Sequence, residues 1–544
     1  MTTFNVRDFG ATGRKADNAG PSIQRAVEAC AEAGGGMVYL PPGEYTSGTI
    51  HLRSHVRFHI EGGATLFSSK NRTDYDAKDD SRTALFCGED LDNITLEGRG
   101  TVDGQAEYEW KVQDFDDRYI KENLDEFLKT GKKPLRAFPK KDCYGRLVLL
   151  LRCTDVRIEG LSFVRSPSWT INPYACRRLV IESVYIHTSL REGVWADGID
   201  PDGCSDVRIS NCTIETGDDA IVFYSTPIWG PALPCENITI TNCRLSSASS
   251  AIKFCDGNNV CVRNVVIDNC VITDSNRGIA FMTFDGGSVS DVVISNCTID
   301  CRRFDWFWWG DGDPLYFMSR RRFAELHPEL GREDPPAGAI RNILIKDVIA
   351  HGKARCLLRG HPSQWLEGIR FDDVRLFLSA DPSADYNKEG SGLTIRYAKD
   401  VALRNVEVIL ENPSTPKWKS PLAFEDAKDV FVEGFRGRLP KGSREPAISL
   451  KNVTGAIIHN CRVDPAGATL LVVGTGSRDV TLDPGALPEI PEAPAPRRPP
   501  SRRKPGVRAK TAKKPAPKAF LARKPARKTP ARAKPAAKSK KSRP

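Results

Sequence analysis

A short repeat along most of the chain limits its fold more than any other feature. Each unit contains apolar-x-apolar, two polar or small residues, and apolar-x-apolar again. Clear copies begin at Val156, Val207, Ile238, Val265 and Val292, and looser ones at Ile343, Ile369, Val401, Val430 and Ala456. Apolar residues at every second position predict short strands with one buried face. The Asn or Gly in the middle of the unit suits a turn with a positive φ.

The spacing of these units predicts a solenoid whose coils stack on one another. The third residues of successive units are 23 to 31 residues apart, namely Ile158, Ile181, Ile209, Ile240, Ile267 and Ile294. Strand, turn and strand at such a period are typical of an all-β solenoid, in which each coil adds about 4.8 Å of height. We therefore predict a single-stranded right-handed parallel β-helix with at least eight coils between Thr49 and Asp464.

The cysteines fit this fold better than a disulfide framework. Four of the 16 cysteines share one place in the repeat, namely Cys212, Cys243, Cys270 and Cys297. Stacking would put them in a ladder inside the helix, where a free thiol behaves as a small apolar group. Four thiols strung along an axis cannot converge on one tetrahedral metal ion, so we expect no metal there.

The two ends of the chain differ from the repeat. Residues 19–33 form an amphipathic pattern with Ile23, Ala26, Val27 and Cys30 on one face, which predicts a helix that caps the solenoid. From Ala495 to Pro544 there are 20 Lys or Arg and no Asp or Glu. We therefore predict a β-helix domain over residues 1–487 and a disordered Lys/Arg/Pro/Ala-rich tail over 488–544.

The body and the tail of the chain carry opposite net charges. The whole chain carries +10, so the 494 residues before the basic tail carry a net −10. The acidic body gives no reason to expect nucleic-acid binding, whereas the tail either binds polyanions nonspecifically or is a solvated linker. No apolar run resembles a signal peptide or a membrane span, which predicts a cytoplasmic protein with no membrane partner; export by another route stays open. We expect a monomer.

Three aspartates in two short segments are the candidate catalytic residues. Asp197 lies in WADGID, and Asp218 and Asp219 lie in TGDDAI, 21 residues further on. Because that separation is close to one coil, the three carboxyls should cluster on one exterior face. Clustered acids repel, so one of them keeps a proton beside ionised carboxylates, as glycosidic cleavage requires.

Two other interpretations of these acids stay open. Gly-Asp-Asp is also an ordinary turn sequence. Alternatively, acids on adjacent coils can bind Ca²⁺ through six to eight oxygens. A polysaccharide lyase of this architecture would use that arrangement with a Lys or Arg as base, and Lys253 or Arg277 could serve.

The sequence resembles glycoside hydrolase family 28, the polygalacturonases and their relatives, from about Phe4 to Asp464. The similarity includes FNVRDFGATG, GGGMVYLPPGEYTSGTIHL and SPSWTINP. Asp197 occupies the place of the Asp in the family's Asn-Thr-Asp motif, and GDDAIV contains its Gly-Asp-Asp pair. The resemblance implies a pectin-lyase-like β-helix and an inverting glycosidase that cleaves a pectin-like polysaccharide or oligosaccharide without a cofactor or metal.

The roles of the three aspartates also follow from this resemblance. It implies that Asp218 is the general acid, and that Asp197 and Asp219 position and deprotonate the attacking water. In an inverting enzyme the acid and base carboxyls are about 6.5–9.5 Å apart.

Other family motifs are altered in this chain. Trp195-Ala196 replaces Asn-Thr, and no histidine lies between His187 and His327. The Arg-Ile-Lys segment that grips the substrate carboxylate aligns near residues 276–280, where only Arg277 could stand in. We assign substrate binding to Lys253, Arg277 and Trp195, and expect weak or no activity on unmodified polygalacturonate. A lyase on the same fold and a noncatalytic carbohydrate-binding solenoid are the alternatives.

An aromatic insertion interrupts the repeat after Arg302. Trp306, Trp308 and Trp309 can stack on sugars, and Asp305, Asp311 and Asp313 add hydrogen-bond acceptors. We include Trp308 and Trp309 among the candidate substrate-binding residues. The alternative is that the aromatic side chains cover the flank of a coil as a small satellite core.

Overall fold

The computed structural model describes residues 2–75, 80–112, 135–304, 310–326, 335–380, 390–411 and 418–482. They belong to a compact unit that spans Met1–Pro488. The predicted basic tail lies outside the described residues. No helix in the described ranges is both long and apolar enough to cross a membrane.

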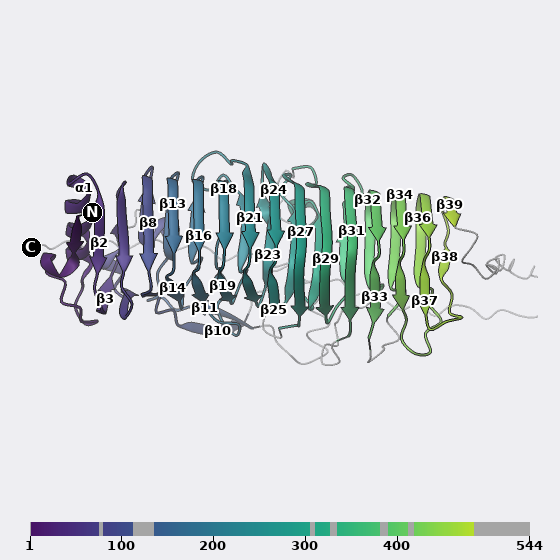
Figure 1. Ribbon diagram of the computed structural model, residues 1–544, viewed down its shortest axis with the longest axis horizontal. Coiled ribbons are helices and arrows are strands. Elements are labelled where there is room, and N and C mark those ends of the chain that lie inside the picture. Colours follow the sequence, from purple (N-terminus) through teal and green to yellow (C-terminus); the bar gives the residue numbers. More distant parts are fainter. Residues whose placement is uncertain are drawn as a thin grey trace, which may run out of the picture. The chain divides into compact units, whose positions relative to one another are not determined.

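The body is a parallel β-helix (Figure 1). One ladder of parallel strands runs along its whole length. In order it contains β2 (Gly36–Leu40), β5 (Val56–Ile60), β8 (Asp92–Gly98), β13 (Thr154–Glu159), β16 (Arg177–Glu182), β18 (Ser205–Ser210), β21 (Cys235–Thr241), β24 (Cys261–Asp268), β27 (Ser288–Cys301), β29 (Ala339–Gly352), β31 (Leu366–Leu378), β32 (Leu393–Arg404), β34 (Leu422–Glu433), β36 (Ile448–His459) and β39 (Arg478–Leu482). The predicted fold, with more than eight coils, is confirmed.

The register of this ladder agrees with the repeat. The six isoleucines at the third position, from Ile158 to Ile294, pair directly with one another from coil to coil. A column of phenylalanines fills the interior beside them. The ring centroids of Phe223, Phe254, Phe281 and Phe317 are 5.3, 4.3 and 4.1 Å apart in turn.

Asparagines form the turn inside each repeat. Asn211, Asn242 and Asn269 have φ of 57°, 56° and 53°. Their amides also form a ladder: Asn242 Nδ2 donates to Asn211 Oδ1 at 3.3 Å, and Asn269 Nδ2 donates to Asn242 Oδ1 at 2.7 Å. A second left-handed column, which we had not predicted, lies near the start of the strands and includes Asn237 in β21 and Asn264 in β24, at φ of 60° and 55°.

The cysteine ladder lies in the interior as predicted. Cys212, Cys243, Cys270 and Cys297 are each at most 2% exposed and belong to the main apolar core. No cysteine whose side chain is described forms a disulfide. The thiols therefore contribute apolar packing to the core.

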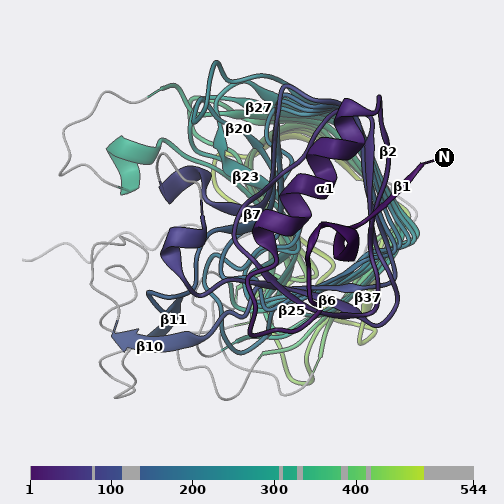
Figure 2. The same ribbon diagram turned by 90° about the vertical axis from the view of Figure 1, so that its left-hand side faces the viewer.

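The predicted capping helix covers the N-terminal end of the solenoid. It is α1 (Gly20–Glu32), which begins with Pro21 in its first turn and ends just before Gly34, where φ is 85°. The predicted apolar face, which includes Ile23 and Val27, is fully buried. Figure 2 shows α1 lying across the end of the coils, beside β1 (Thr3–Asn5) and β2.

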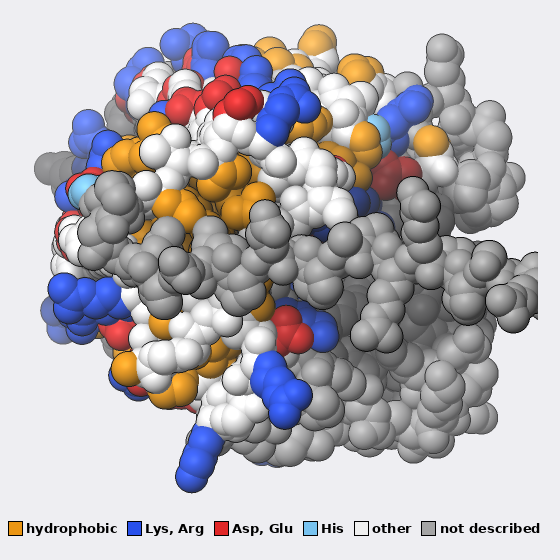
Figure 3. Space-filling view, turned by 90° about the vertical axis from the view of Figure 1, so that its right-hand side faces the viewer, with side chains coloured by type: hydrophobic (Ala, Val, Ile, Leu, Met, Phe, Trp, Pro, Cys, Tyr) orange, Lys and Arg blue, Asp and Glu red, His pale blue; other side chains and the backbone are white. Residues whose placement is uncertain are grey.

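The opposite end of the solenoid is less covered in the described part. It contains β38 (Leu471–Val473) and β39. Figure 3 shows apolar side chains gathered on this end. Val472 and Val473 are 44% and 40% exposed.

A different face of the solenoid carries the candidate site. It is formed by β12 (Arg146–Leu151), β15 (Ile171–Tyr174), β20 (Ile221–Ser225), β23 (Ser250–Asn258), β26 (Arg277–Thr283) and β28 (Asp313–Ser319). Parallel pairing connects β12 to β15 and connects β20 through β23 and β26 to β28. Ile199 joins the two groups, because it bridges Ile171 on one side and Ile221 on the other.

Candidate active site

The three predicted aspartates lie together. Asp197 is in the segment before Ile199, and Asp218 and Asp219 form the turn between β19 (Thr213–Thr216) and β20. One carboxylate oxygen from each lies within 4.8 Å of the other two. They are 2%, 8% and 1% exposed, so these side chains are more buried than we had expected for carboxyls on an exterior face.

Backbone pairing between coils brings these segments together. Gly198 N donates to Asp219 O at 2.9 Å, which places Asp197 one coil before the Gly-Asp-Asp turn. Both glycines are needed for this close approach. A Cβ on Gly198 would lie 2.3 Å from Ala220 O, and one on Gly217 would lie 2.0 Å from Glu192 O.

Backbone donors orient the Asp218 carboxyl. Its Oδ2 accepts a hydrogen bond from Trp195 N, and its Oδ1 accepts one from Asp219 N, both at 3.0 Å. Trp195 has a left-handed φ of 71°, and its ring is half exposed and packs edge-on against Phe138. Trp195 therefore contacts the site through its backbone, and its predicted contact with substrate stays a prediction.

Asp219 is paired with Lys253. Lys253 Nζ lies 2.9 Å from Oδ2, and Ser250 N donates to Oδ1 at 3.0 Å. The two charged side chains are 14% and 2% exposed, so this is a largely buried ion pair. Lys253, which we had assigned to the substrate, contacts a candidate catalytic carboxylate of its own chain.

Asp200 is a fourth acid at this site, and the sequence analysis did not single it out. It is fully buried, and among the described residues no N–H or hydroxyl donates to either of its oxygens or to Asp197 Oδ1. Burial raises the pKa of Asp200 well above its ordinary range. Asp197 and Asp200 are both buried, and the charge of Asp200 raises the pKa of Asp197, so at least one of the two carboxyls keeps a proton. The sequence WADGID contained a hint that Asp200 is a buried acid, since Asp200 directly follows the apolar Ile199.

The proton is therefore favoured at a place that we had not predicted. Burial, followed by the charge of Asp218, raises the pKa of Asp197 well above its ordinary range. That Asp218 is the general acid stays a prediction from the resemblance. The nearest oxygens of the cluster are also closer, within 4.8 Å, than the expected separation of 6.5–9.5 Å. The expectation of inversion thus rests on the resemblance and not on this spacing.

Arg277 lies two coils beyond Asp219 on the same face, because Ser250 stands between them in the ladder. It is 5% exposed, its Nε is 3.9 Å from Asp313 Oδ2, and its guanidinium lies 4.0 Å from the centroid of the Tyr316 ring. Asp313 also accepts a hydrogen bond from Asp311 N at 2.9 Å. These two acids, which we had considered as substrate acceptors, thus contribute to the local structure.

Part of the aromatic insertion falls in a gap between the described ranges. Asp305, Trp306, Trp308 and Trp309 lie outside the described residues. Among the residues that are described, Asp197, Asp218 and Asp219 form the one group of acids, histidines and cysteines spaced to ligate a metal. The ammonium group of Lys253 already balances charge in that group.

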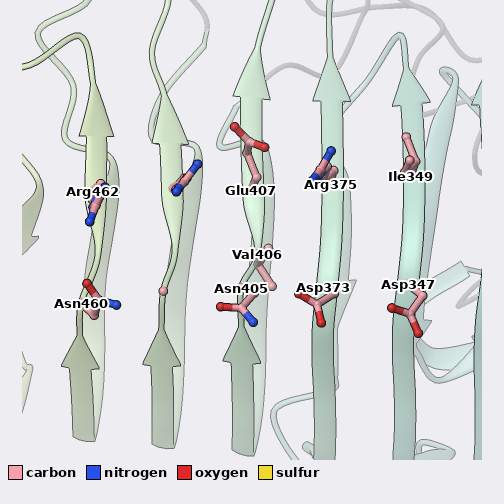
Figure 4. Close-up of a pocket in the computed structure, with 11 residues that line it drawn as sticks. Asp347, Ile349, Asp373, Arg375, Asn405, Val406, Glu407, Asn460 and Arg462 are labelled. Atoms are coloured by element: carbon pink, nitrogen blue, oxygen red, sulfur yellow. The ribbon is translucent and has the colours of Figure 1, made fainter.

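The groove drawn in Figure 4 lies on a different part of the surface, at a corner of the solenoid. It has a volume of about 680 Å³ and crosses successive coils from β29 to β37 (Arg462–Asp464). One row along it includes Asp347, Asp373 and Asn405, and the next row includes Arg375 and Glu407. None of the clustered acids lines this groove.

The fold and this site define a single-stranded parallel β-helix protein with a carboxylate centre on one exterior sheet. The model of the family described as glycosyl hydrolases family 28 matches residues 30–301, half of the chain. The chain belongs to this family.

Curated relatives and solved structures agree with this assignment. The chain is 27% identical over 235 residues to a probable polygalacturonase of Vitis vinifera, which covers 40% of this chain and 43% of that protein. It is 26% identical over 255 residues to an exopolygalacturonase of Platanus acerifolia, which covers 44% of this chain and 56% of that protein. The chain thus spans about half the length of the curated relatives it matches.

Two solved structures share the fold. An exopolygalacturonase of Thermotoga maritima has a TM-score of 0.56 at 22% identity, over 75% of this chain and 92% of that one. A family 28 exopolygalacturonase of Yersinia enterocolitica has a TM-score of 0.59 at 18% identity, over 80% of this chain and 78% of that one. Both similarities concern the fold alone.

Proposed function

We propose that this protein is a glycoside hydrolase that cleaves O-glycosidic bonds in a pectin-like polysaccharide or oligosaccharide. One observation carries the proposal: carboxyls from two adjacent coils of a family 28 fold converge within 4.8 Å. Proton donation to the leaving oxygen and activation of water require such a group of acids. The names of the matched relatives, polygalacturonase and exopolygalacturonase, support the substrate class.

Each aspartate has a distinct role in this proposal. Asp218, oriented by two backbone N–H groups, donates the proton to the leaving oxygen. Asp197 accepts the proton of the attacking water, which requires that the proton held by the buried Asp197 and Asp200 carboxyls be on Asp200 at this step. Lys253 and Ser250 hold Asp219, whose carboxylate then positions the water and balances the charge of the site.

The test is hydrolysis of a panel of pectic and neutral oligosaccharides, followed by reducing-end release and by ultraviolet absorbance. A hydrolase releases reducing ends with no new absorbance, whereas a lyase leaves an absorbing unsaturated product. Binding without either signal would indicate a noncatalytic carbohydrate-binding protein. Proton NMR of the first product should show inversion, and retention would contradict the proposed mechanism.

We infer a separate property for the basic tail from its composition. Twenty positive charges and no acids within residues 495–544 should bind nucleic acids and other polyanions without sequence preference. Gel-shift titrations of the whole chain and of residues 1–487 at two salt concentrations would test this. Equal affinity of the two proteins would reject a role for the tail.

A further inference from the structure

Arg146, which the sequence analysis passed over, is a buried arginine on the same face as the acids. It is the first residue of β12 and is 9% exposed. Its guanidinium lies near two indole rings, 4.8 Å from the centroid of Trp169 and 5.1 Å from that of Trp229. These contacts hold the guanidinium in place and limit its hydration.

Arg146 forms no ion pair with a carboxylate in the described part of the chain, although Asp200 and Asp197 act on its charge from further away and raise its pKa against the effect of burial. Nε donates to Asn172 Oδ1 at 2.9 Å, and Nη1 donates to Ser81 O at 2.6 Å. A guanidinium has five N–H groups, so three remain with no acceptor among the described residues. A buried charge without a partner is costly, so this arrangement favours an anionic ligand.

Arg146 also stands in line with the catalytic candidates. Val148 N donates to Thr170 O at 2.9 Å, and Thr170 N donates to Asp197 O at 3.0 Å. The strand of Arg146 is therefore two strand spacings, about 10 Å, from the segment of Asp197. Asn172 connects the two places, since its Oδ1 accepts from Arg146 and its Nδ2 donates to Asp200 O at 3.0 Å.

The other two basic residues of this face are engaged differently. Lys253 forms the ion pair with Asp219, and Arg277 lies beside Asp313. Both therefore have carboxylates of the protein beside them. Arg146 differs from both of them, because its guanidinium is fixed in position and forms no ion pair with an acid of the protein.

We propose that Arg146 binds the carboxylate of an acidic sugar and selects uronate-containing over neutral substrates. This inference rests on the proposed function, and it names the substrate class of that same site. The flat guanidinium suits a two-point contact with a carboxylate. We had expected weak activity on polygalacturonate because the Arg-Ile-Lys segment is altered. Under this proposal that expectation is withdrawn, because Arg146 supplies a cation on the opposite side of the acids from Arg277.

The experiment measures binding without turnover. Full-length Asp218→Asn protein is titrated by calorimetry with trigalacturonate and with its carboxyl-reduced form, which has the same linkages but no charge. We expect tighter binding of trigalacturonate, and Arg146→Gln in the same background should weaken it by at least about tenfold. Binding of the reduced form should change by less than about twofold.

Two further variants sharpen the test. Arg157→Gln is the matched control, because Arg157 is 48% exposed and its ion pairs are at the surface, so it should leave both affinities unchanged. Arg146→Lys keeps the charge but loses the planar fork, and it serves if Arg146→Gln does not fold. This variant should also weaken the binding of trigalacturonate more than the binding of the reduced form.

The outcomes separate this inference from the proposed function. Equal affinity of the parent protein for the two trisaccharides, or an equal loss of both in Arg146→Gln, would overturn the role of Arg146. Efficient hydrolysis of neutral oligosaccharides alone would reject this inference but leave the hydrolase intact. Arg146-dependent binding of trigalacturonate without any cleavage by the unmodified protein would support this inference and reject the hydrolase.

Discussion

The ammonium group of Lys253 lies 2.9 Å from Oδ2 of Asp219, which is on the preceding coil. Both side chains are largely buried. The Gly-Asp-Asp motif therefore has its own internal cation, which neutralises part of the charge that three clustered acids would otherwise accumulate. This pair makes Lys253 a structural part of the site.

Removing that lysine should destabilise the protein. In Lys253→Met, Asp219 is left as a buried charge without its cation, and such a change costs about 3–5 kcal/mol. Urea unfolding would measure it. Lys346→Met removes an exposed lysine that is 43% accessible, and should cost little. Adding Asp219→Asn to Lys253→Met should recover part of the loss, and no recovery would argue against the ion pair.

Replacing the proposed general acid should abolish most activity. Asp218→Asn removes the proton given to the leaving oxygen, so turnover should fall by about 10²–10⁴-fold. The fold should survive, with a change in unfolding free energy of about 1–2 kcal/mol, because the amide can keep one of the two backbone hydrogen bonds. Asp206→Asn is the control, since Asp206 lies in the left-handed turn column outside the site. An active Asp218→Asn enzyme would reject the assignment.

The stability of the Asp200→Asn variant should depend on pH in a defined direction. Because burial raises the pKa of Asp200, the folded state keeps a proton that the unfolded chain loses above about pH 4. The buried carboxyl of Asp200 therefore makes the unmodified protein less stable as pH rises. Asn has no such proton, so the variant should gain about 1–3 kcal/mol relative to the unmodified protein between pH 4 and pH 7.

Asp155→Asn provides a control of opposite sign for this measurement. The hydrogen bond from Arg178 lowers the pKa of Asp155, so its contribution is present at pH 7 and is lost as pH falls. This variant should therefore become less stable than the unmodified protein as pH rises. Chemical unfolding at several pH values would measure both variants, and parallel profiles would contradict the assigned environments.

Removing residues 488–544 should leave the folded body unchanged. A tail of Lys, Arg, Pro and Ala without apolar periodicity cannot bury enough surface to offset the entropy of ordering it. We expect the same melting temperature and the same glycosidase activity for residues 1–487. A loss of several degrees on truncation would show that the tail packs on the body.

The repeat alone was enough to predict the solenoid, its turns and the inward cysteines. Each coil contacts mainly its two neighbours, so a local pattern with a regular period also defines which residues stack. For the same reason the separation of 21 residues between Asp197 and Asp218 predicted their proximity. The second left-handed column was missed because Asp and Asn at the start of a strand are also common in ordinary turns.

Only the tertiary structure decided which charges meet. Lys253 pairs with Asp219 because its strand, β23, lies beside β20, which begins just after Asp219, and Asp200 is buried by the coils around it. Arg146 is 51 residues from Asp197 in the sequence, outside the regular repeat, and comes within two strands of it through the pairing of β12 with β15. Such contacts depend on loop lengths and side-chain directions across coils, which a periodic pattern of apolar residues does not encode.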